Sequence, residues 1–430
     1  QHRKLGDLTG FMTYNVPVVS GAVTDSYMKT EETKPDITRG RSRMAAVIMF
    51  GHMIKHLYGS GFQTLILPEI KISLGLSLAQ FGLLGSVRAL SWWFATMAGG
   101  YLGDRFTSKT AVFLGFTIIF IGLSLFVVGF ATNYWILLAT MLLIGGAPAM
   151  FHPFAIGELS RRFPDKRGFA VSLHGMGGMT GEVLGPLVVA GILAFLMWRD
   201  VLKLSLFPAI IIAFTVWIVL RTLPRMESQV ASRKEYFVSM GALLRNPMLM
   251  ILVVSTAIRG MGESAVDGFL PVYLKDTLDY SDRNVALVFS GAQVVGLAAQ
   301  PIMGYVSDRF GRKVVLIPAT ITIGVLSLLL SVATPGIQVV LIILAKGTFK
   351  FSLHHIFIAA AIDASEGEAQ STVTSLMYGA GLLAILSPYV AGLISDNYGI
   401  HSAFVFGGVM TLMSFVVLIR YRAPRPDAWN

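Results

Sequence analysis

Apolar stretches of about 20 residues, separated by short polar segments, recur along most of the chain. A stretch of that length crosses the roughly 30 Å hydrocarbon core of a membrane when it is helical. The pattern therefore predicts an all-α polytopic membrane protein with twelve transmembrane helices, six on each side of a polar stretch at 222–246. The expected spans are residues 44–66, 79–101, 110–131, 133–157, 168–197, 203–221, 247–274, 284–306, 314–333, 337–361, 370–394 and 401–420.

The two groups of six helices share a repeated pattern. The loop sequence Gly100-Tyr-Leu-Gly-Asp104-Arg105 returns, altered, as Gly304-Tyr-Val-Ser-Asp308-Arg309. Four further matches follow at one common shift: Gly145 with Gly347, His152 with His354, Gly177 with Gly379, and Pro186 with Pro388. The repeat predicts two pseudo-symmetric six-helix bundles, at residues 44–221 and 247–422, joined by a cytoplasmic linker at 222–246.

Composition and charge agree with a membrane protein. Apolar residues make up 54% of the chain and charged residues only 13%, whereas soluble domains carry about 25% charge. The net charge of +10 does not indicate nucleic acid, because Lys and Arg concentrate in the loops on the side of the first repeated motif. By the positive-inside rule, that side and both termini are cytoplasmic. The absence of cysteine excludes disulfides and thiolate metal sites.

The ends of the chain are polar. Residues 1–43 lack the apolar core of a signal peptide, so we expect a polar cytoplasmic extension there and a short cytoplasmic tail at 423–430. We expect the protein to lie in the cell (inner) membrane, to contact lipid headgroups through its basic loops, and to be a monomer.

Ionisable residues inside the expected helices follow a pattern. The cores of the helices at 110–131, 203–221, 314–333 and 401–420 contain none. A charge at mid-bilayer costs about 2.5–3.5 kcal/mol on insertion scales and usually faces the interior of a bundle. The remaining helices therefore line a polar centre, and these four face lipid.

The cations of this centre form the candidate binding site. His52, Lys55 and His56 fall on one helical stripe, and Lys346, Lys350 and His354 recur every four residues. With Arg88 and Arg259, five mid-helix Lys and Arg residues outnumber three acids. This excess favours a small organic anion, a carboxylate or phosphonate held by charge-assisted hydrogen bonds. The alternative is structural, with Arg259 paired to Glu263 and Lys346 reaching toward the interface.

The acids and the remaining histidines are candidates for proton coupling. They are Glu182, Glu263, Asp267, His152 and His174, and burial or a changing neighbour can move such groups across the working pH. Arg259 is expected to hold Glu263 ionised, which favours Asp267 or Glu182 as carrier. Asp267 can equally close an outer gate through a salt bridge.

No metal or cofactor is expected. His52 and His56 have the spacing of one helical face, but Lys55 beside them repels a cation. His354 and His355 are adjacent in sequence and point about 100° apart on a helix.

The repeated loop resembles the signature loops of transporters of the major facilitator superfamily. The resemblance implies two parallel six-helix halves that rock about a central site. It also implies gating roles at the cytoplasmic side for the loop residues Asp104, Arg105, Asp308, Arg309 and Arg312. The first copy departs from the pattern at Thr107-Ser108, where the second keeps Gly311-Arg312-Lys313.

Two further motifs narrow the resemblance. Gly181-Glu-Val-Leu-Gly185-Pro186 is similar to the Gly-x-x-x-Gly-Pro element of proton-coupled antiporters, which implies a gating role for Gly185 and Pro186. Phe151-His152-Pro153 and Leu67-Pro68-Glu-Ile70 resemble the fosmidomycin-resistance group, mainly in the first half of the chain.

The sequence thus favours a proton-coupled secondary transporter of a small organic anion that works by alternating access. One alternative is a multidrug/proton antiporter that exports lipophilic compounds. Another is a non-transporting membrane sensor or scaffold. An enzyme is not expected, because the chain shows no nucleophile–base motif.

Overall fold

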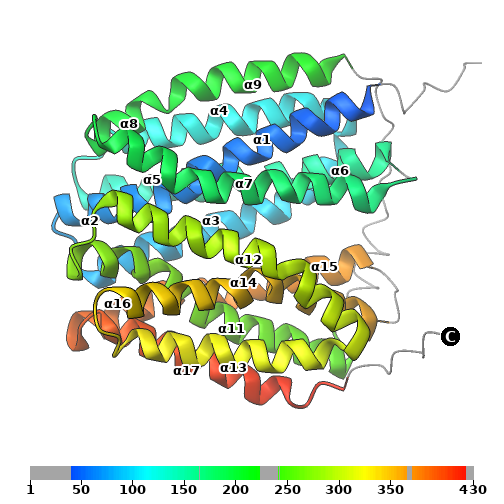
Figure 1. The fold of residues 1–430 in the computed structure, drawn as a ribbon. Coiled ribbons are helices and arrows are strands. Elements are labelled where there is room, and N and C mark those ends of the chain that lie inside the picture. The colour runs from blue at the N-terminus through cyan, green and yellow to red at the C-terminus, as the bar shows by residue number, and fades with distance from the viewer. Residues whose placement is uncertain (1–39, 164, 223–240, 242, 366–369, 423–430) are drawn as a thin grey trace, which may run out of the picture. The chain divides into compact units, whose positions relative to one another are not determined.

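The computed structural model describes residues 40–163, 165–222, 241, 243–365 and 370–422, which all fall in one unit. Most of the expected linker, the N-terminal extension up to residue 39 and the C-terminal tail lie outside this part. The described residues are helical and contain no strand (Figure 1). The helices of the first half are α1 (Arg41–Gly61), α2 (Leu67–Ser73), α3 (Leu78–Arg105), α4 (Thr110–Val128), α5 (Tyr134–Ala149), α6 (Phe151–Arg162), α7 (Arg167–Leu193), α8 (Trp198–Leu204) and α9 (Leu206–Arg221).

The second half repeats this order with its own interruptions. Its helices are α11 (Pro247–Val272), α12 (Asp282–Phe310), α13 (Arg312–Leu330), α14 (Ile337–Ala364), α15 (Gln370–Gly379), α16 (Ser387–Tyr398) and α17 (His401–Leu418). The π-helical turns Phe62–Ile66 and Tyr273–Thr277 follow the first helix of each half. The expected helix at 370–394 is instead α15, a 3₁₀ segment at Ala380–Ala384, and α16.

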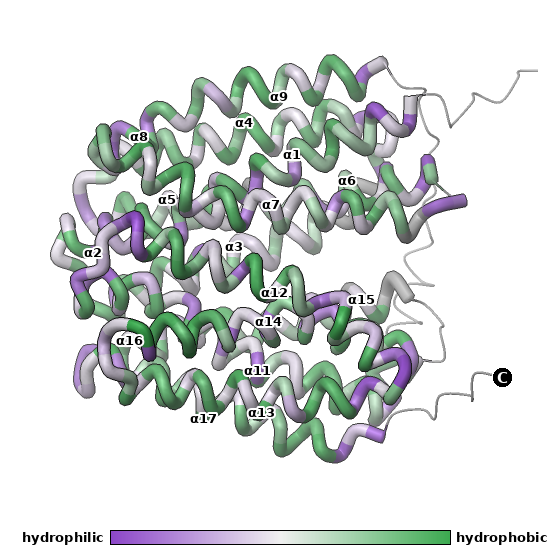
Figure 2. Tube along the Cα trace, in the orientation of Figure 1, coloured by the Kyte–Doolittle hydropathy of each residue, from purple (hydrophilic) through white to green (hydrophobic). Residues whose placement is uncertain are grey.

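Ten helical segments of the described part are long and apolar enough to cross a membrane. The other two expected spans coincide with α1 and α3; α1 is less apolar because it carries the stripe of His and Lys residues. Figure 2 shows hydrophobic residues along most of α9 and α17, with hydrophilic residues gathered toward the helix ends. The twelve-helix arrangement expected from the sequence is therefore confirmed.

A row of glycines sets the distance between α1 and α7. Gly177, Gly181 and Gly185 lie four residues apart on α7, and each packs against a backbone carbonyl of α1, those of Met49, Met53 and Leu57. A Cβ atom at any of the three would overlap its partner, so the helices meet backbone to backbone. We call this contact the glycine seam.

The two halves meet along two helix pairs, α3 with α16 and α7 with α12. In the first pair, Gly82 of α3 packs against the carbonyl of Pro388, and the backbone N–H of Tyr389 donates to Ser86 Oγ at 3.3 Å. In the second pair, Ser290 Oγ of α12 donates to the carbonyl of Val183 in α7 at 2.7 Å.

The glycine seam gives the first testable prediction. Gly181→Leu places a side chain against the Met53 carbonyl and His56, and overpacking of this kind costs about 1–3 kcal/mol. Thermal unfolding of the purified protein in detergent should show a lower midpoint. Gly175→Leu is the matched control on the same helix, because a Cβ there meets no atom within 4 Å. Equal midpoints for the two variants would show that the seam does not set the packing.

Candidate functional site

The polar stripe of α1 faces α6 and α7. His52 and Lys55 are 4% and 6% exposed, so both are buried within the first half. Because the glycine seam brings α1 and α7 close together, short side chains suffice to bridge the two helices. A Cβ atom at Gly178 would overlap the imidazole of His52. The local packing therefore depends on glycine at this position too.

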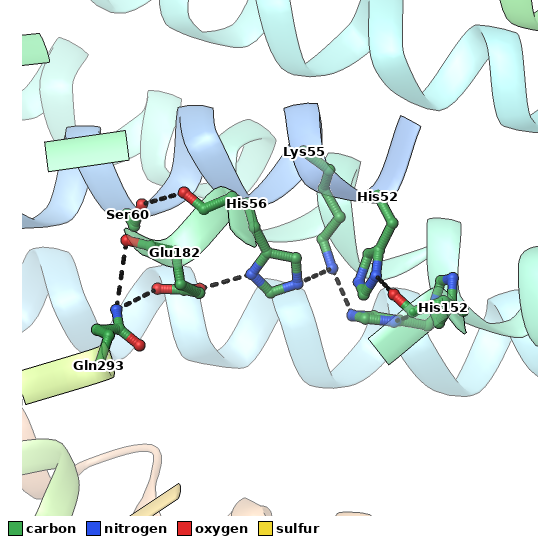
Figure 3. Close-up of polar contacts among 9 residues, drawn as sticks. His52, Lys55, His56, Ser60, His152, Glu182 and Gln293 are labelled. Atoms are coloured by element: carbon green, nitrogen blue, oxygen red, sulfur yellow. Dashed lines mark hydrogen bonds and ion pairs between the residues drawn. The ribbon is translucent and has the colours of Figure 1, made fainter. Parts of the chain in front are cut away.

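A continuous chain of polar contacts starts at Lys55 and runs toward the second half (Figure 3). Lys55 Nζ lies 3.3 Å from His56 Nε2, and His56 Nδ1 lies 2.5 Å from Glu182 Oε1. The other carboxylate oxygen, Glu182 Oε2, accepts a hydrogen bond of 3.1 Å from Gln293 Nε2 of α12. The chain thus crosses from one half of the protein to the other.

The same lysine also begins a second arm, toward α6. Lys55 Nζ contacts His152 Nε2, and His152 Nδ1 lies 3.4 Å from His174 Nε2. His52 Nδ1 donates to the backbone carbonyl of His174 at 2.6 Å, and the two rings stack at 3.7 Å. We call the whole series His174–His152–Lys55–His56–Glu182 the Lys55–Glu182 chain.

One set of proton positions satisfies every contact in this chain. A Lys55 ammonium donates to the Nε2 atoms of His152 and His56, so both rings carry their proton on Nδ1. His152 Nδ1–H then donates to His174, and His56 Nδ1–H donates to the Glu182 carboxylate. With these proton positions, Lys55 is positively charged, Glu182 is negatively charged and the histidines between them are neutral.

Three imidazoles of this region lie near one another. The helical spacing within residues 44–66 does not predict this grouping, because two of the three histidines lie on other helices. Nitrogen atoms of His52, His152 and His174 lie within 4.8 Å of one another. The rings of His52 and His174 are nearly parallel, with 5° between their planes, so their lone pairs do not converge on one point. His152 Nε2 already contacts Lys55. The geometry does not favour a metal ion, and we assign none.

A second charge cluster lies in the other half, between α11 and α14. Arg259 Nη1 lies 2.7 Å from Glu263 Oε1 on the same helix. Asp267 binds two lysines of α14, with Lys350 Nζ at 2.7 Å and Lys346 Nζ at 3.4 Å. We call these five residues the α11–α14 cluster. It carries three basic and two acidic side chains.

Members of the cluster differ in exposure. The side chains of Arg259 and Lys346 are 3% and 5% exposed, whereas Lys350 and Asp267 reach 28% and 37%. The guanidinium of Arg259 also lies 5.0 Å above the ring of Phe357. The accessible end of the cluster is therefore the Lys350–Asp267 pair, and its Arg259 end is held by packing.

Two predicted binding residues join neither group. Within the described part, Arg88 makes no hydrogen bond or ion pair; it lines a cavity of about 50 Å³ with Lys55, Tyr58 and Ser124. His354 packs near the ring of Tyr378, with 5.3 Å between centroids, and does not contact Lys350 or Asp267 in the structure. The four-residue spacing predicts that His354 shares a helix face with Lys346. In the structure, His354 is not part of the α11–α14 cluster.

The loop-motif residues make contacts within their own half. Arg312 binds Asp308, and its Nε lies 2.7 Å from Asp363 at the end of α14. Arg309 Nη1 donates to Tyr305 at 2.6 Å. The side chain of Asp104 lies outside the described residues, and Arg105 is exposed beside the ring of Phe106. A gating role for these residues stays a prediction.

At the same end of the first half, α1 is tied to the loop before α7. Arg41 Nη1 and Nη2 lie 2.6 and 3.1 Å from the two carboxylate oxygens of Asp165. This hydrogen bonding lowers the pKa of the exposed Asp165 carboxyl from its usual value.

At the opposite end, which carries α2, ion pairs join the two halves. Lys71, after α1, binds Asp276, after α11, and Lys275 binds Glu69 and Asp282. Lys71 and Lys275 occupy equivalent places in the repeat, so the two cross-half pairs are reciprocal. We call the pairs Lys71–Asp276 and Lys275–Glu69 the α2-end latch.

A further contact at this end caps a helix across the halves. Asp396 of α16 accepts hydrogen bonds from the backbone N–H groups of Leu78 and Ala79 at 2.7 and 2.9 Å, and from Ser77 Oγ at 2.9 Å. A carboxylate at a helix N-terminus satisfies free donors and the helix dipole. The latch residues, Asp396 and Gln293 were not among the site residues predicted from the sequence.

The chain is similar to known proteins along most of its length. The sequence profile of the Major Facilitator Superfamily matches residues 48–281 and 252–430. The fosmidomycin resistance protein of Escherichia coli (strain K12) is 22% identical over 404 residues, 90% of this chain and 97% of that protein. The oxalate:formate antiporter of Oxalobacter formigenes is 24% identical over 384 residues, 82% and 85% of the two chains. The fosmidomycin-resistance resemblance, seen mainly in the first half, thus extends over most of the chain.

Solved structures share the fold. The nucleoside transporter NupG superimposes with a TM-score of 0.70 at 13% identity, covering 88% of this chain and all of that one. A bacterial homologue of the human lysosomal transporter Spinster, in an inward-facing and unoccupied conformation, gives 0.70 at 17% identity, covering 89% and 95%. With two matched halves, twelve helices and a charged centre, this chain belongs to the Major Facilitator Superfamily and is a multi-pass membrane transporter.

Proposed function

We propose that the protein couples proton movement to the transport of a small organic anion by alternating access. The observation that carries this proposal is the placement of two different charge systems. The Lys55–Glu182 chain lies in one half, and the cation-rich α11–α14 cluster lies in the other. Lys350 and Glu182 interact electrostatically across the boundary between the halves.

The Lys55–Glu182 chain is suited to moving a proton. His56 Nδ1–H passes its proton to Glu182 Oε1 as Lys55 passes one to His56 Nε2. Lys55 and Glu182 are then both neutral, and His56 has changed tautomer. A proton that arrives at His174 restores the Lys55 ammonium once this arm has reversed, with His174 Nε2–H donating to His152 Nδ1 and His152 Nε2–H donating to Lys55. Glu182 then holds one additional proton, which it releases when access alternates.

The α11–α14 cluster is suited to an anion. Its three cations exceed its two acids, and Lys350 is accessible while it binds Asp267. A substrate carboxylate or phosphonate competes with Asp267 for the lysines and forms charge-assisted hydrogen bonds with them. Arg88 adds a cation that makes no hydrogen bond or ion pair within the described residues. One relative is named as an oxalate:formate antiporter and another for resistance to fosmidomycin, a phosphonate, and these names support a small anion as substrate.

The arrangement also supports a conformational assignment. Cross-half ion pairs and the Asp396 cap hold the α2 end together, and the ion pairs described at the loop-motif end join residues of one half. The excess of basic residues at the loop-motif end supports a cytoplasmic position for that end. The described conformation is then inward-facing, in a cell (inner) membrane with both termini cytoplasmic.

Uptake into proteoliposomes tests the function. We expect oxalate, formate or a small phosphonate to be transported when a pH gradient is imposed, with saturation. Lys350→Gln should weaken substrate affinity about tenfold to a hundredfold, because a charge-assisted bond contributes about 1.5–3 kcal/mol. Glu182→Gln should abolish the dependence on the gradient. Both variants should reach normal membrane yield.

The control variant is Lys203→Gln, which removes an exposed cation that pairs with Asp200 and belongs to neither charge system. It should transport as the unmodified protein does. Transport of lipophilic cations with no anion transport would replace this proposal with a multidrug antiporter. Gradient-independent anion flux would remove proton coupling from it.

The α2-end latch gives a second prediction. Each partly exposed ion pair contributes up to about 1 kcal/mol, so Lys71→Gln with Lys275→Gln should favour the outward-open state about tenfold. Ser86→Cys, 2% exposed at the contact of α3 with α16, reports opening. A membrane-impermeant thiol reagent added from outside should label it faster in the double variant.

The chain has no native cysteine, so the label is unique. Arg283→Gln at the same end is the control, since Arg283 is not part of either latch pair. Unchanged labelling in the double variant would show that these ion pairs do not hold the end closed.

A further inference from the structure

Gln293 is the point at which the second half contacts the Lys55–Glu182 chain (Figure 3). It lies on α12, is 7% exposed, and donates from Nε2 to Glu182 Oε2 at 3.1 Å. The same amide nitrogen lies 3.4 Å from the backbone carbonyl of Glu182. One side chain therefore contacts both the titratable group and the backbone that carries it.

Pro186 explains why that carbonyl is open to an outside donor. Proline has no backbone N–H, so the carbonyl four residues earlier loses its helical hydrogen bond. In α7 the residue four positions before Pro186 is Glu182. Within a membrane such a freed carbonyl is satisfied by a neighbouring helix, and here Gln293 supplies the donor.

The other atom of the same amide is unused. Gln293 Oε1 is buried and has no hydrogen-bond partner. Buried acceptors are normally satisfied, and an unsatisfied one costs about 1–3 kcal/mol. The proton that His56 delivers lies on Glu182 Oε1, whereas Gln293 contacts Glu182 Oε2. Gln293 Oε1 can therefore accept the O–H of a neutral Glu182 after a half-turn of the carboxyl group and a rotation of the amide. That rotation exchanges the 3.4 Å contact with the backbone for a bond to the protonated carboxyl.

We propose that Gln293 is a positioning residue that binds both protonation states of Glu182 by reversing its amide. With the carboxylate, Gln293 Nε2–H donates; with the acid, Glu182 O–H donates to Gln293 Oε1. The contact between α7 and α12 therefore persists while the proton arrives. This inference rests on the proposed function, in which Glu182 is the proton carrier.

The other charged and titratable groups around Glu182 come from three helices. His56 of α1 donates to Oε1, and Lys55 lies behind it in the chain. Lys350 of α14 and Arg88 of α3 interact with Glu182 electrostatically without a hydrogen bond. Gln293 is thus the hydrogen-bond partner of Glu182 that does not titrate, and its amide can change from donor to acceptor without gaining or losing a proton.

Ser290 provides a matched control one helical turn away. Its Oγ donates to the carbonyl of Val183 at 2.7 Å, so it joins the same two helices without touching a titratable group. A purely structural role for Gln293 predicts that Gln293 and Ser290 variants behave alike. A role in protonation predicts that they differ.

Infrared spectroscopy of the full-length protein in lipid tests the proposal without a substrate. The C=O band of protonated Glu182, identified by its loss in Glu182→Gln, is followed against pH. In Gln293→Leu the ionised carboxylate loses a stronger hydrogen bond than the neutral acid does, so the midpoint should rise by about one pH unit. Ser290→Ala should leave the midpoint unchanged.

Gln293→Glu is a second variant that keeps a polar group at the contact. Two facing carboxyls share one proton, so the midpoint should rise further. Midpoints that match the unmodified protein in both Gln293 variants would overturn the inference, even if Glu182 titrates. A Glu182 band that does not change with pH would instead remove Glu182 as the carrier, and with it the proton path of the proposed function.

Discussion

The polar interior of the first half depends on the close approach of α1 and α7. Glycine at 177, 181 and 185 lets the two backbones touch, and each glycine meets a carbonyl of α1. At that distance the imidazole of His56 reaches Glu182, and the ring of His52 stacks on His174. A wider spacing would leave these groups apart and buried without partners, which membrane proteins do not tolerate. The seam thus places the chain of contacts as well as the helices.

The repeat places equivalent helices together, but its two halves have different chemistry. The contact of α3 with α16 uses Ser86, and the contact of α7 with α12 uses Ser290, its counterpart in the repeat. Next along each helix the residues diverge. Arg88 and Ala89 in α3 correspond to Ala292 and Gln293 in α12. Among the described residues, the second contact therefore joins a titratable carboxylate to an amide and the first does not, so the two contacts between the halves differ in chemistry.

Periodicity and charge counting from the sequence found the helices and most of the ionisable residues inside them. A four-residue spacing shows which side chains share a helix face, and this was enough to expect the pair of Arg259 with Glu263. It does not show which residue another helix presents to that face. Asp267 was therefore weighed as a carrier or a gate, whereas the structure places it between Lys346 and Lys350. The same limit left His354 grouped with lysines that it does not contact.

Contacts between the halves were the least predictable from sequence. Lys71 and Lys275 lie in loops between expected helices, and their partners in the other half depend on how the two bundles dock. A search for charged residues does not identify Gln293, because its side chain is neutral. Pro186 could have indicated a contact at this position, because a proline in a buried helix frees a carbonyl that a neighbouring helix must satisfy.

A buried ion pair alone is poor evidence for stability, because the desolvation of two charges offsets much of their attraction. Lys55 and Glu182 do not touch; two proton shifts through His56 can remove both charges without moving a heavy atom. Proton transfer can therefore remove both charges. A directly bonded pair of arginine and carboxylate, such as Arg162 with Glu158, keeps its charges because arginine does not lose its proton. In the α11–α14 cluster, Lys350 keeps its charge as long as Asp267 or a substrate anion is beside it. In the proposed function, the first half loses its charges and the second half keeps them, and this asymmetry would couple a proton to an anion.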